Sequence, residues 1–163
     1  MLSLAILHFT RDDLTTRCLQ SVLRQDLSSI PHEIFVLDNG SPTPWRLPER
    51  FRGDLRIKSY RLPQNVGNIG GQNACLRLAL HDWVLFLSND VTLTGTWNFQ
   101  WLASFLAHQF PRKLGQFMPI VISPTGTIQS LGLRYQWPGY GLSIRNMTPE
   151  VETLSCIPSI IYG

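Results

Sequence analysis

Three short apolar runs constrain the fold of this chain more than any other feature. They span residues 2–9 (LSLAILHF), 34–37 (IFVL) and 83–87 (WVLFL), and each gives way at once to polar residues. Strands that are buried on both faces of a sheet have this unbroken apolar pattern, whereas half-exposed strands alternate. The sequence therefore predicts buried strands whose ends are marked by polar side chains.

A helical pattern follows the first strand. Leu14, Cys18 and Val22 recur at helical spacing, and Thr10 stands three residues before Asp13. A threonine at this distance from an acidic residue is similar to a capping box. We therefore expect a helix that begins just after Thr10.

The same alternation of strands and helices continues to residue 90. Residues 55–62 read as a more exposed strand, 65–73 as a glycine-rich turn and 74–82 as a helix that leads into the strand at 83–87. This order predicts an α/β domain with a mostly parallel sheet flanked by helices. In the second half, we expect an apolar helix over 96–110, a hairpin over 115–135 and a loop over 136–150.

Composition limits the class of protein. The 163 residues are 44% hydrophobic and 15% charged, which is typical of one globular domain. No apolar run approaches the ~20 residues that span a bilayer, and the start lacks the basic leader of a signal peptide. Three cysteines fit neither a disulfide framework nor a metal site, so we expect a reduced, cytoplasmic chain.

The net charge of +3 is spread along the chain, with a concentration of basic residues over 46–61. This segment could bind a phosphate-bearing ligand or an anionic membrane surface, or it could be a solvated loop and edge strand. Because the basic residues are otherwise scattered, we expect no nucleic-acid partner.

Polar residues gather at three predicted strand ends: 8–10 (HFT), 38–41 (DNGS) and 88–90 (SND). Ligands of open α/β sheets bind beyond the carboxyl ends of the strands. The sequence therefore predicts a binding site at this edge of the sheet.

Five segments, taken in this order, resemble the family 2 glycosyltransferases, in particular their rhamnosyltransferase-like and galactofuranosyltransferase-like members. The segments are residues 5–25, 34–41 (IFVLDNGS), 61–80 (RLPQNVGNIGGQNACLRLAL), 83–93 (WVLFLSNDVTL) and 124–133 (PTGTIQSLGL). The resemblance implies a GT-A fold within a single domain, with a nucleotide-sugar-binding half over residues 1–95 and part of an acceptor-binding half over 96–163.

The resemblance also implies a reaction. Members of this family move a sugar from a nucleotide-diphosphate donor to an acceptor hydroxyl, with inversion and with Mg or Mn bridging the diphosphate. The acceptor would be a glycan or a lipid-linked glycan in cell-surface polysaccharide or glycan synthesis. Such work would place the chain in the cytoplasm, at the inner face of the membrane.

The resemblance assigns the base-binding residues to the first two strand ends. Phe9 and Thr10 match the stretch that cups the base, and Asp38 matches the aspartate that accepts a hydrogen bond from it, with Asn39 beside it. The structural alternatives are a core aromatic residue for Phe9 and a simple Asx turn for Asp38.

The glycine-rich segment matches the turn and helix start that face the nucleotide in the family. The matching residues are Asn65, Gly67, Gly71 and Asn73, while Gln72 stands where many members carry an arginine. A tight turn that lets a helix pack on the sheet would use the same glycines.

Ser88-Asn89-Asp90 matches the Asp-x-Asp motif of the family. A hard divalent cation needs oxygen ligands, and Mg²⁺ usually takes one or two protein carboxylates together with phosphates and waters. The resemblance makes Asp90 the metal ligand and Asn89 a donor-binding residue. A strand-ending aspartate that only starts a loop is the alternative.

No catalytic base is identified. An inverting transferase needs a group that takes the acceptor's proton, and after Asp90 the only acidic residues are Glu150 and Glu152, in unrelated contexts. The chain could be a fragment, could be completed by another chain, or could be a non-catalytic nucleotide-sugar-binding or interaction module. A sugar nucleotidyltransferase is disfavoured, because residues 7–16 contain neither the glycine nor the lysine of that loop.

Overall fold

The computed structural model describes residues 1–93 and, beyond them, the backbone of six short strands between residues 116 and 162. Contacts between Cα atoms divide the chain into two compact units, Met1–Ala107 and His108–Gly163. The helix predicted over 96–110 and most of the predicted acceptor-binding half lie outside the described residues.

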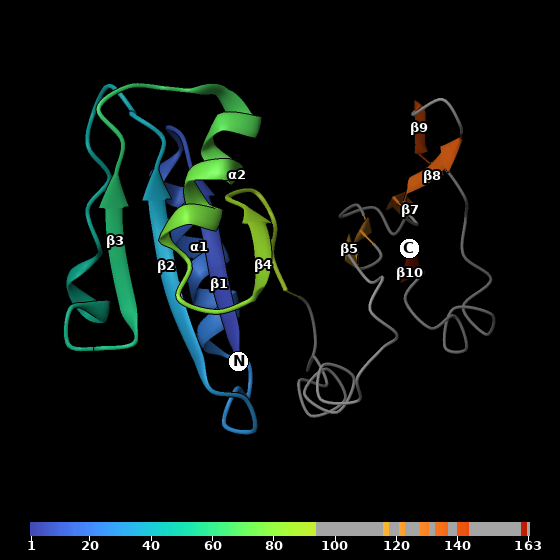
Figure 1. Cartoon of the computed structure of the whole chain (residues 1–163). Helices are drawn as coiled ribbons and strands as arrows, with labels where there is room; N and C mark the ends of the chain where they lie inside the picture. Colours follow the sequence, from blue (N-terminus) through green and yellow to red (C-terminus); the bar gives the residue numbers. More distant parts are fainter. Residues whose placement is uncertain are drawn as a thin grey trace. The chain divides into compact units, whose positions relative to one another are not determined.

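The first unit contains a four-stranded parallel sheet in the order β3-β2-β1-β4 (Figure 1). Its elements are β1 Leu2–His8, α1 Asp12–Leu23, β2 His32–Asp38, the short 3-10 helix η1 Glu49–Phe51, β3 Ile57–Arg61, α2 Gly67–Leu78 and β4 Trp83–Ser88. The prediction of an α/β domain with a mostly parallel sheet flanked by helices is therefore confirmed.

The two helices cover opposite faces of the sheet (Figure 1). On the α1 face, Leu4 and Ile6 of β1 join Cys18 and Val22 in one apolar cluster. On the α2 face, a second cluster contains four fully buried residues, Ala5, Phe35, Leu37 and Cys75. Because successive strand residues point to opposite faces, unbroken apolar runs supply both clusters.

The start of α1 differs from the prediction of a capping box. Thr10 and Arg11 have positive φ angles of 53° and 47°, and no side chain caps the helix. The Thr10 backbone N–H instead donates to Oγ of Ser41, 3.0 Å away. A left-handed turn after β1 thus replaces the capping box, because it directs Thr10 to the loop after β2.

The helix α2 begins at Gly67, so the prediction of a turn over 65–73 is wrong for most of that segment. Oδ1 of Asn65 accepts the Gly67 N–H at 2.8 Å, and Oδ1 of Asn39 accepts the Val66 N–H at 3.1 Å. A side chain from the end of β2 therefore helps to start this helix. Such a partner, distant in sequence, overrides the low helix propensity of glycine.

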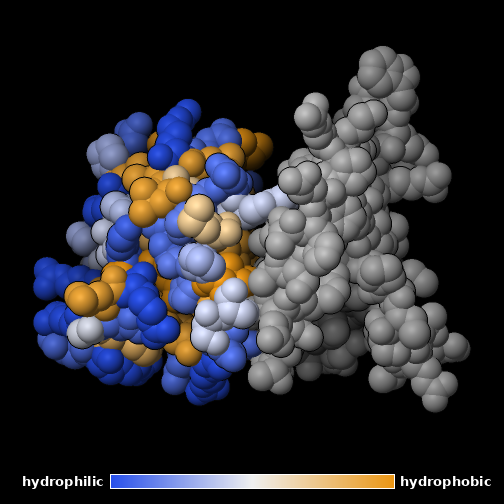
Figure 2. Space-filling view, turned by 60° about the horizontal axis from the view of Figure 1, so that its bottom comes forward, coloured by the Kyte–Doolittle hydropathy of each residue, from blue (hydrophilic) through white to orange (hydrophobic). Residues whose placement is uncertain are grey.

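The strand β4 is less buried than its apolar sequence predicts. Within residues 1–93 it pairs with β1 alone, and Phe86 is 36% exposed. Ile69, Leu76 and Leu80 of the α2 region are also exposed. Exposed apolar side chains interrupt the hydrophilic surface of this unit (Figure 2).

In the second unit, short strands form antiparallel pairs. β6 Val121–Ile122 pairs with β7 Ile128–Ser130, so the hairpin predicted over 115–135 is confirmed for residues 121–130. β8 Leu133–Gln136 pairs with β9 Tyr140–Ser143, so part of the predicted loop is a strand. β5 Gln116–Phe117 pairs with β10 Ile161–Tyr162.

Among the residues that the structure describes, no helix is both long and apolar enough to cross a bilayer.

Candidate functional site

The polar strand ends meet at one edge of the sheet. In register, His8 of β1 lies opposite Asp38 of β2, and Leu7 lies opposite Ser88 of β4. The carboxyl ends of the four strands therefore point to the same side (Figure 1). This is the convergence that the sequence predicted.

Asn39 joins this edge to the start of α2. Its Nδ2 donates to Oδ1 of Asn65 at 3.1 Å and to the carbonyl oxygen of Gly67 at 3.0 Å. Its backbone N–H donates to the carbonyl oxygen of His8 at 2.8 Å. The structure thus brings together three of the predicted donor-binding residues, Asn39, Asn65 and Gly67.

Two glycines permit close contacts at this edge, one between the loop after β2 and the segment before α2, and one between α2 and the sheet. Gly40 has a φ of +68°, and a Cβ atom there would overlap the backbone of Gln64 and lie 2.5 Å from the Asn65 nitrogen. At Gly71, a Cβ atom would lie 2.8 Å from a methyl group of Leu7 and 3.2 Å from Nδ2 of Asn39. The backbone of α2 can therefore pack directly on the end of the sheet.

Asp38 is enclosed by donors. Its Oδ1 accepts the Ser41 N–H at 2.8 Å, and its Oδ2 accepts the Trp45 N–H at 3.1 Å and Nη1 of Arg61 at 2.7 Å. Burial by itself would raise the pKa of Asp38, but these hydrogen bonds and the arginine charge outweigh it, so the pKa is lowered. Asp38 is therefore a charged and almost fully buried group.

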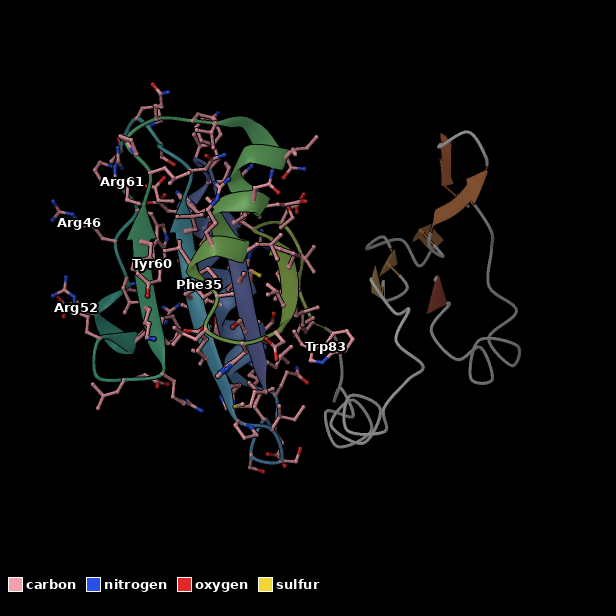
Figure 3. All side chains as sticks on the ribbon, viewed as in Figure 1. Phe35, Arg46, Arg52, Tyr60, Arg61 and Trp83 are labelled. Atoms are coloured by element: carbon pink, nitrogen blue, oxygen red, sulfur yellow. The ribbon has the colours of Figure 1, made fainter. Side chains whose placement is uncertain are left out.

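Arg61 is a member of this site that the sequence analysis missed. Its Nη2 donates to the carbonyl oxygen of Ser41 at 2.8 Å, while Nη1 holds Asp38. Figure 3 shows Arg61 at the carboxyl end of β3. The register of β2 and β3 could have indicated it, because Arg61 lies opposite Asp38 in this parallel pair.

A second polar chain links β1 to the end of β4. Nδ1 of His8 lies 2.6 Å from Oγ1 of Thr15, which accepts Nδ2 of Asn89 at 3.2 Å. Burial lowers the pKa of His8, although Asp38 and Asp12 act in the opposite direction. His8 therefore has a structural partner in Thr15, and the Thr15 hydroxyl also holds Asn89 at the sheet edge.

Asp90 follows this edge and is exposed. Within residues 1–93, no hydrogen bond or ion pair engages its carboxylate, and no cluster of three or more His, Cys, Asp or Glu residues forms a metal site. The charge of Asp90 also acts on the nearby thiol of Cys18. The pKa of Cys18 is raised to about 12, mainly by burial and to a smaller extent by this charge. Among the residues that the structure describes, the exposed Asp90 carboxylate therefore has no partner.

The remaining predicted residues differ in their placement. Phe9 is 40% exposed directly after β1, which leaves its ring accessible to a ligand. Thr10 is bound through its backbone to Ser41. Asn73 is exposed on α2, two residues from the buried Gly71, and so lies on the helix face away from the sheet. The structure does not bring Asn73 to the other residues.

Comparison with solved structures identifies proteins that share the fold of this chain. S. aureus TarS aligns with 22% identity and a TM-score of 0.55, over 74% of this chain and 25% of that chain. S. aureus TarS 1–349 in complex with UDP-GlcNAc aligns with 21% identity and a TM-score of 0.56, over 74% and 40%. The mannosyltransferase PcManGT from Pyrobaculum calidifontis, in complex with GDP-Man and Mn²⁺, gives 18% identity and 0.57, over 76% and 36%.

The chain thus spans between 25% and 40% of the length of these three proteins. No curated protein matches its sequence at a significant level. The shared fold is the GT-A type. A family model described as "Glycosyl transferase family 2" matches residues 3–117, and the chain therefore belongs to this family.

Proposed function

We propose that this chain is the nucleotide-sugar-binding part of a glycosyltransferase, which transfers a sugar from a nucleotide-diphosphate donor to an acceptor hydroxyl. The observation that carries the proposal is the match of residues 3–117 to glycosyl transferase family 2. The polar residues gathered at the carboxyl edge of the sheet support it, because open α/β sheets bind their ligands there.

The start of α2 supports binding of a diphosphate. Helix N-termini attract anions through their free N–H groups and their dipole. The first turn of α2 contains no acidic residue, whereas the first turn of α1 contains Asp12 and Asp13. Of these two helix starts, only that of α2 is therefore left positive. The contacts from Asn39 hold it beside the sheet edge.

The base would lie at the ends of β1, β2 and β3. The exposed ring of Phe9 offers a stacking surface, since every nucleotide base has a π-face. The donors bound by the solved structures above include UDP-GlcNAc and GDP-Man. For this chain we propose a nucleotide-diphosphate sugar. The rhamnosyl or galactofuranosyl subtype stays a prediction.

Asp90 fits a divalent cation. Its carboxylate is exposed at the end of β4, and Mg²⁺ or Mn²⁺ prefers such oxygen ligands in combination with substrate phosphates. A cation held by Asp90 would supply charge neutralisation for the leaving diphosphate. The Thr15 hydroxyl positions Asn89 immediately before Asp90.

Transfer by inversion would form one bond and break another at the anomeric carbon. The acceptor oxygen attacks this carbon, the bond to the diphosphate breaks, and the acceptor proton passes to a general base. Glu150 and Glu152, the acidic residues nearest the end of the chain, lie outside the described residues. The acceptor, a glycan or a lipid-linked glycan at the cytoplasmic face of a membrane, also stays a prediction.

Calorimetry tests this proposal. The 163-residue chain is titrated with UDP-GlcNAc and with GDP-mannose, in Mn²⁺ and again in EDTA, and the same mixtures are assayed for release of free sugar and nucleotide. We expect at least one donor to bind more tightly in Mn²⁺. Binding without release would favour the non-catalytic module, and no binding of any nucleotide sugar would contradict the proposal.

A further inference from the structure

Three polar side chains of α1 form one buried row along the helix. Thr15, Cys18 and Ser21 recur every three residues, so they share one face of α1. Thr15 and Cys18 are 0% exposed and Ser21 is 4% exposed. A buried polar side chain is unfavourable unless it forms a hydrogen bond, and each of these three has a partner in the loop over residues 88–93.

Two members of the row hold the first residues of this loop. Oγ1 of Thr15 accepts a hydrogen bond from Nδ2 of Asn89 at 3.2 Å. Sγ of Cys18 donates to the carbonyl oxygen of Ser88 at 3.8 Å. Because a thiol is a weak donor, the Thr15 hydroxyl provides the stronger of the two contacts. The chain is therefore fastened to α1 immediately before Asp90.

Ser21 holds the other end of the loop. Its Oγ accepts the Leu93 N–H at 3.0 Å and donates to a carbonyl oxygen of α1 at 2.7 Å. Between the two anchors, the Val91 N–H donates to the carbonyl oxygen of Ser88 at 3.0 Å. This bond closes a turn with the exposed Asp90 near its centre. Both flanks of the turn are therefore fastened to one helix.

A fixed position matters for this carboxylate because its neighbours Ser88 and Asn89 offer no second one. Mg²⁺ requires nearly ideal octahedral geometry with oxygen ligands at about 2.1 Å. Loop motion that binding must suppress lowers the affinity for a ligand. Groups that orient a metal ligand typically change metal affinity about 10–100-fold when they are removed. The hydrogen bonds from α1 are therefore placed where they can set the affinity for a cation.

We propose that Thr15 and Ser21 are positioning residues for the cation of the donor, because their hydroxyls fasten the loop over residues 88–93 to α1 and so fix the Asp90 carboxylate. The inference deepens the proposed function and rests on it, since it requires a donor diphosphate and a divalent cation at this edge of the sheet. Its distinguishing consequence is that loss of these hydroxyls weakens donor binding in the presence of the cation and not in its absence.

The test measures donor affinity with and without the cation. The 163-residue chain and its variants are titrated by calorimetry with UDP-GlcNAc and with GDP-mannose, in Mn²⁺ and in EDTA. The Mn²⁺ gain is the dissociation constant in EDTA divided by that in Mn²⁺. Thr15→Val keeps the shape of the side chain but removes the hydroxyl, so the Mn²⁺ gain should fall about tenfold. The dissociation constant in EDTA should change by less than about twofold.

Two matched variants accompany Thr15→Val. Thr15→Ser restores a hydroxyl, and its Mn²⁺ gain should lie within about threefold of that of the unaltered chain. Thr16→Val makes the same chemical change at the next position of α1, where the side chain has no hydrogen bond within residues 1–93. In this variant the Mn²⁺ gain should be unchanged.

Ser21→Ala tests the second anchor independently, and it carries the test if Thr15→Val fails to fold, as judged by circular dichroism. This variant leaves the Leu93 N–H without its partner and should reduce the Mn²⁺ gain by at least about threefold. Its control is Ser29→Ala, an exposed serine after α1 that has no hydrogen bond within the described part of the first unit.

A double variant shows whether Thr15 acts through Asp90. Asp90→Asn removes the charge that would hold the cation, so the further change Thr15→Val should alter the dissociation constant in Mn²⁺ by less than about twofold. A tenfold loss on adding Thr15→Val to Asp90→Asn would mean that Thr15 supports the site in another way, and the inference would be wrong.

Other outcomes also overturn the inference. An undiminished Mn²⁺ gain in both Thr15→Val and Ser21→Ala would mean that other contacts fix the loop. Equal weakening in Mn²⁺ and in EDTA would mean that Thr15 only supports the fold, for example through His8. Donor binding without any Mn²⁺ gain in the unaltered chain would refute the inference and leave the proposed donor binding standing, whereas binding of no nucleotide sugar would refute both.

Discussion

The side-chain amide of Asn39 donates a hydrogen bond to Oδ1 of Asn65, 3.1 Å away, and so ties the end of β2 to the residues that start α2. The same side chain also bonds to Gly67 and Val66. One buried residue therefore holds the helix N-terminus at the sheet edge where the proposed donor lies.

Asn39→Ala should lower the free energy of unfolding by about 2–3 kcal/mol, because it leaves the Val66 N–H and the Gly67 carbonyl without these partners. Urea denaturation measures this difference. The control is Asn68→Ala, which changes an exposed asparagine in the first turn of α2 and should alter stability by less than about 0.5 kcal/mol. Equal stability of the two variants would show that the Asn39 contacts contribute nothing.

Gly40 and Gly53 both lie between β2 and β3, and substitution of each by alanine compares a crowded glycine with one in open space. Gly40→Ala introduces a Cβ against the backbone of Gln64 at a φ of +68°, whereas a Cβ at Gly53 meets nothing within 4 Å. We expect Gly40→Ala to cost about 3 kcal/mol or more, and Gly53→Ala less than about 0.5 kcal/mol. Thermal denaturation compares them, and a mild effect at Gly40 would mean that the loop shifts freely.

Glu33 should make stability depend on pH. Its buried carboxylate accepts the Ser3 hydroxyl at 2.7 Å, the Leu80 N–H at 2.7 Å and Nζ of Lys58 at 3.2 Å. Burial by itself would raise the pKa of Glu33, but these bonds together hold it below the ordinary value of 4.5. A lowered folded-state pKa gives stability that is present above the unfolded-state pKa and is lost as the pH falls through the folded-state value.

Glu33→Gln should therefore destabilise the chain by about 1–3 kcal/mol at pH 7, and the difference should shrink as the pH falls below 4.5. Urea denaturation at a series of pH values measures it. Glu49→Gln is the control, since Glu49 is exposed and pairs only with the exposed Arg52 within residues 1–93. A difference between Glu33→Gln and the unaltered chain that stays constant at all pH values would contradict this account.

The strands and the first helix of the first unit were predictable because each of them carries its own pattern. The apolar runs of β1, β2 and β4 and the spacing of Leu14, Cys18 and Val22 in α1 depend on local sequence and the repeat of the structure. Because the strands are parallel, their polar ends were expected to meet at one edge of the sheet. Local information was therefore enough to place the candidate site at the carboxyl edge of the sheet.

The errors at the candidate site involve partners that are far apart in the chain. Thr10 binds Ser41 in place of capping α1, and Asn39 starts α2 at glycines that looked like a turn. Arg61 reads as a surface residue of an exposed strand until the register sets it beside Asp38. Such contacts are decided by tertiary packing, which overrides local propensity and leaves no pattern in a single sequence.

The most direct test of the donor site compares Asp90→Asn with Asp82→Asn. Both aspartates are exposed, and they lie just beyond opposite ends of β4. The measurement is the dissociation constant of a nucleotide-diphosphate sugar in Mn²⁺ and in EDTA. We expect Asp82→Asn to keep the Mn²⁺-dependent gain in affinity. In Asp90→Asn this gain should be at least about tenfold smaller. An undiminished gain in Asp90→Asn would contradict the assignment of Asp90 as the metal ligand.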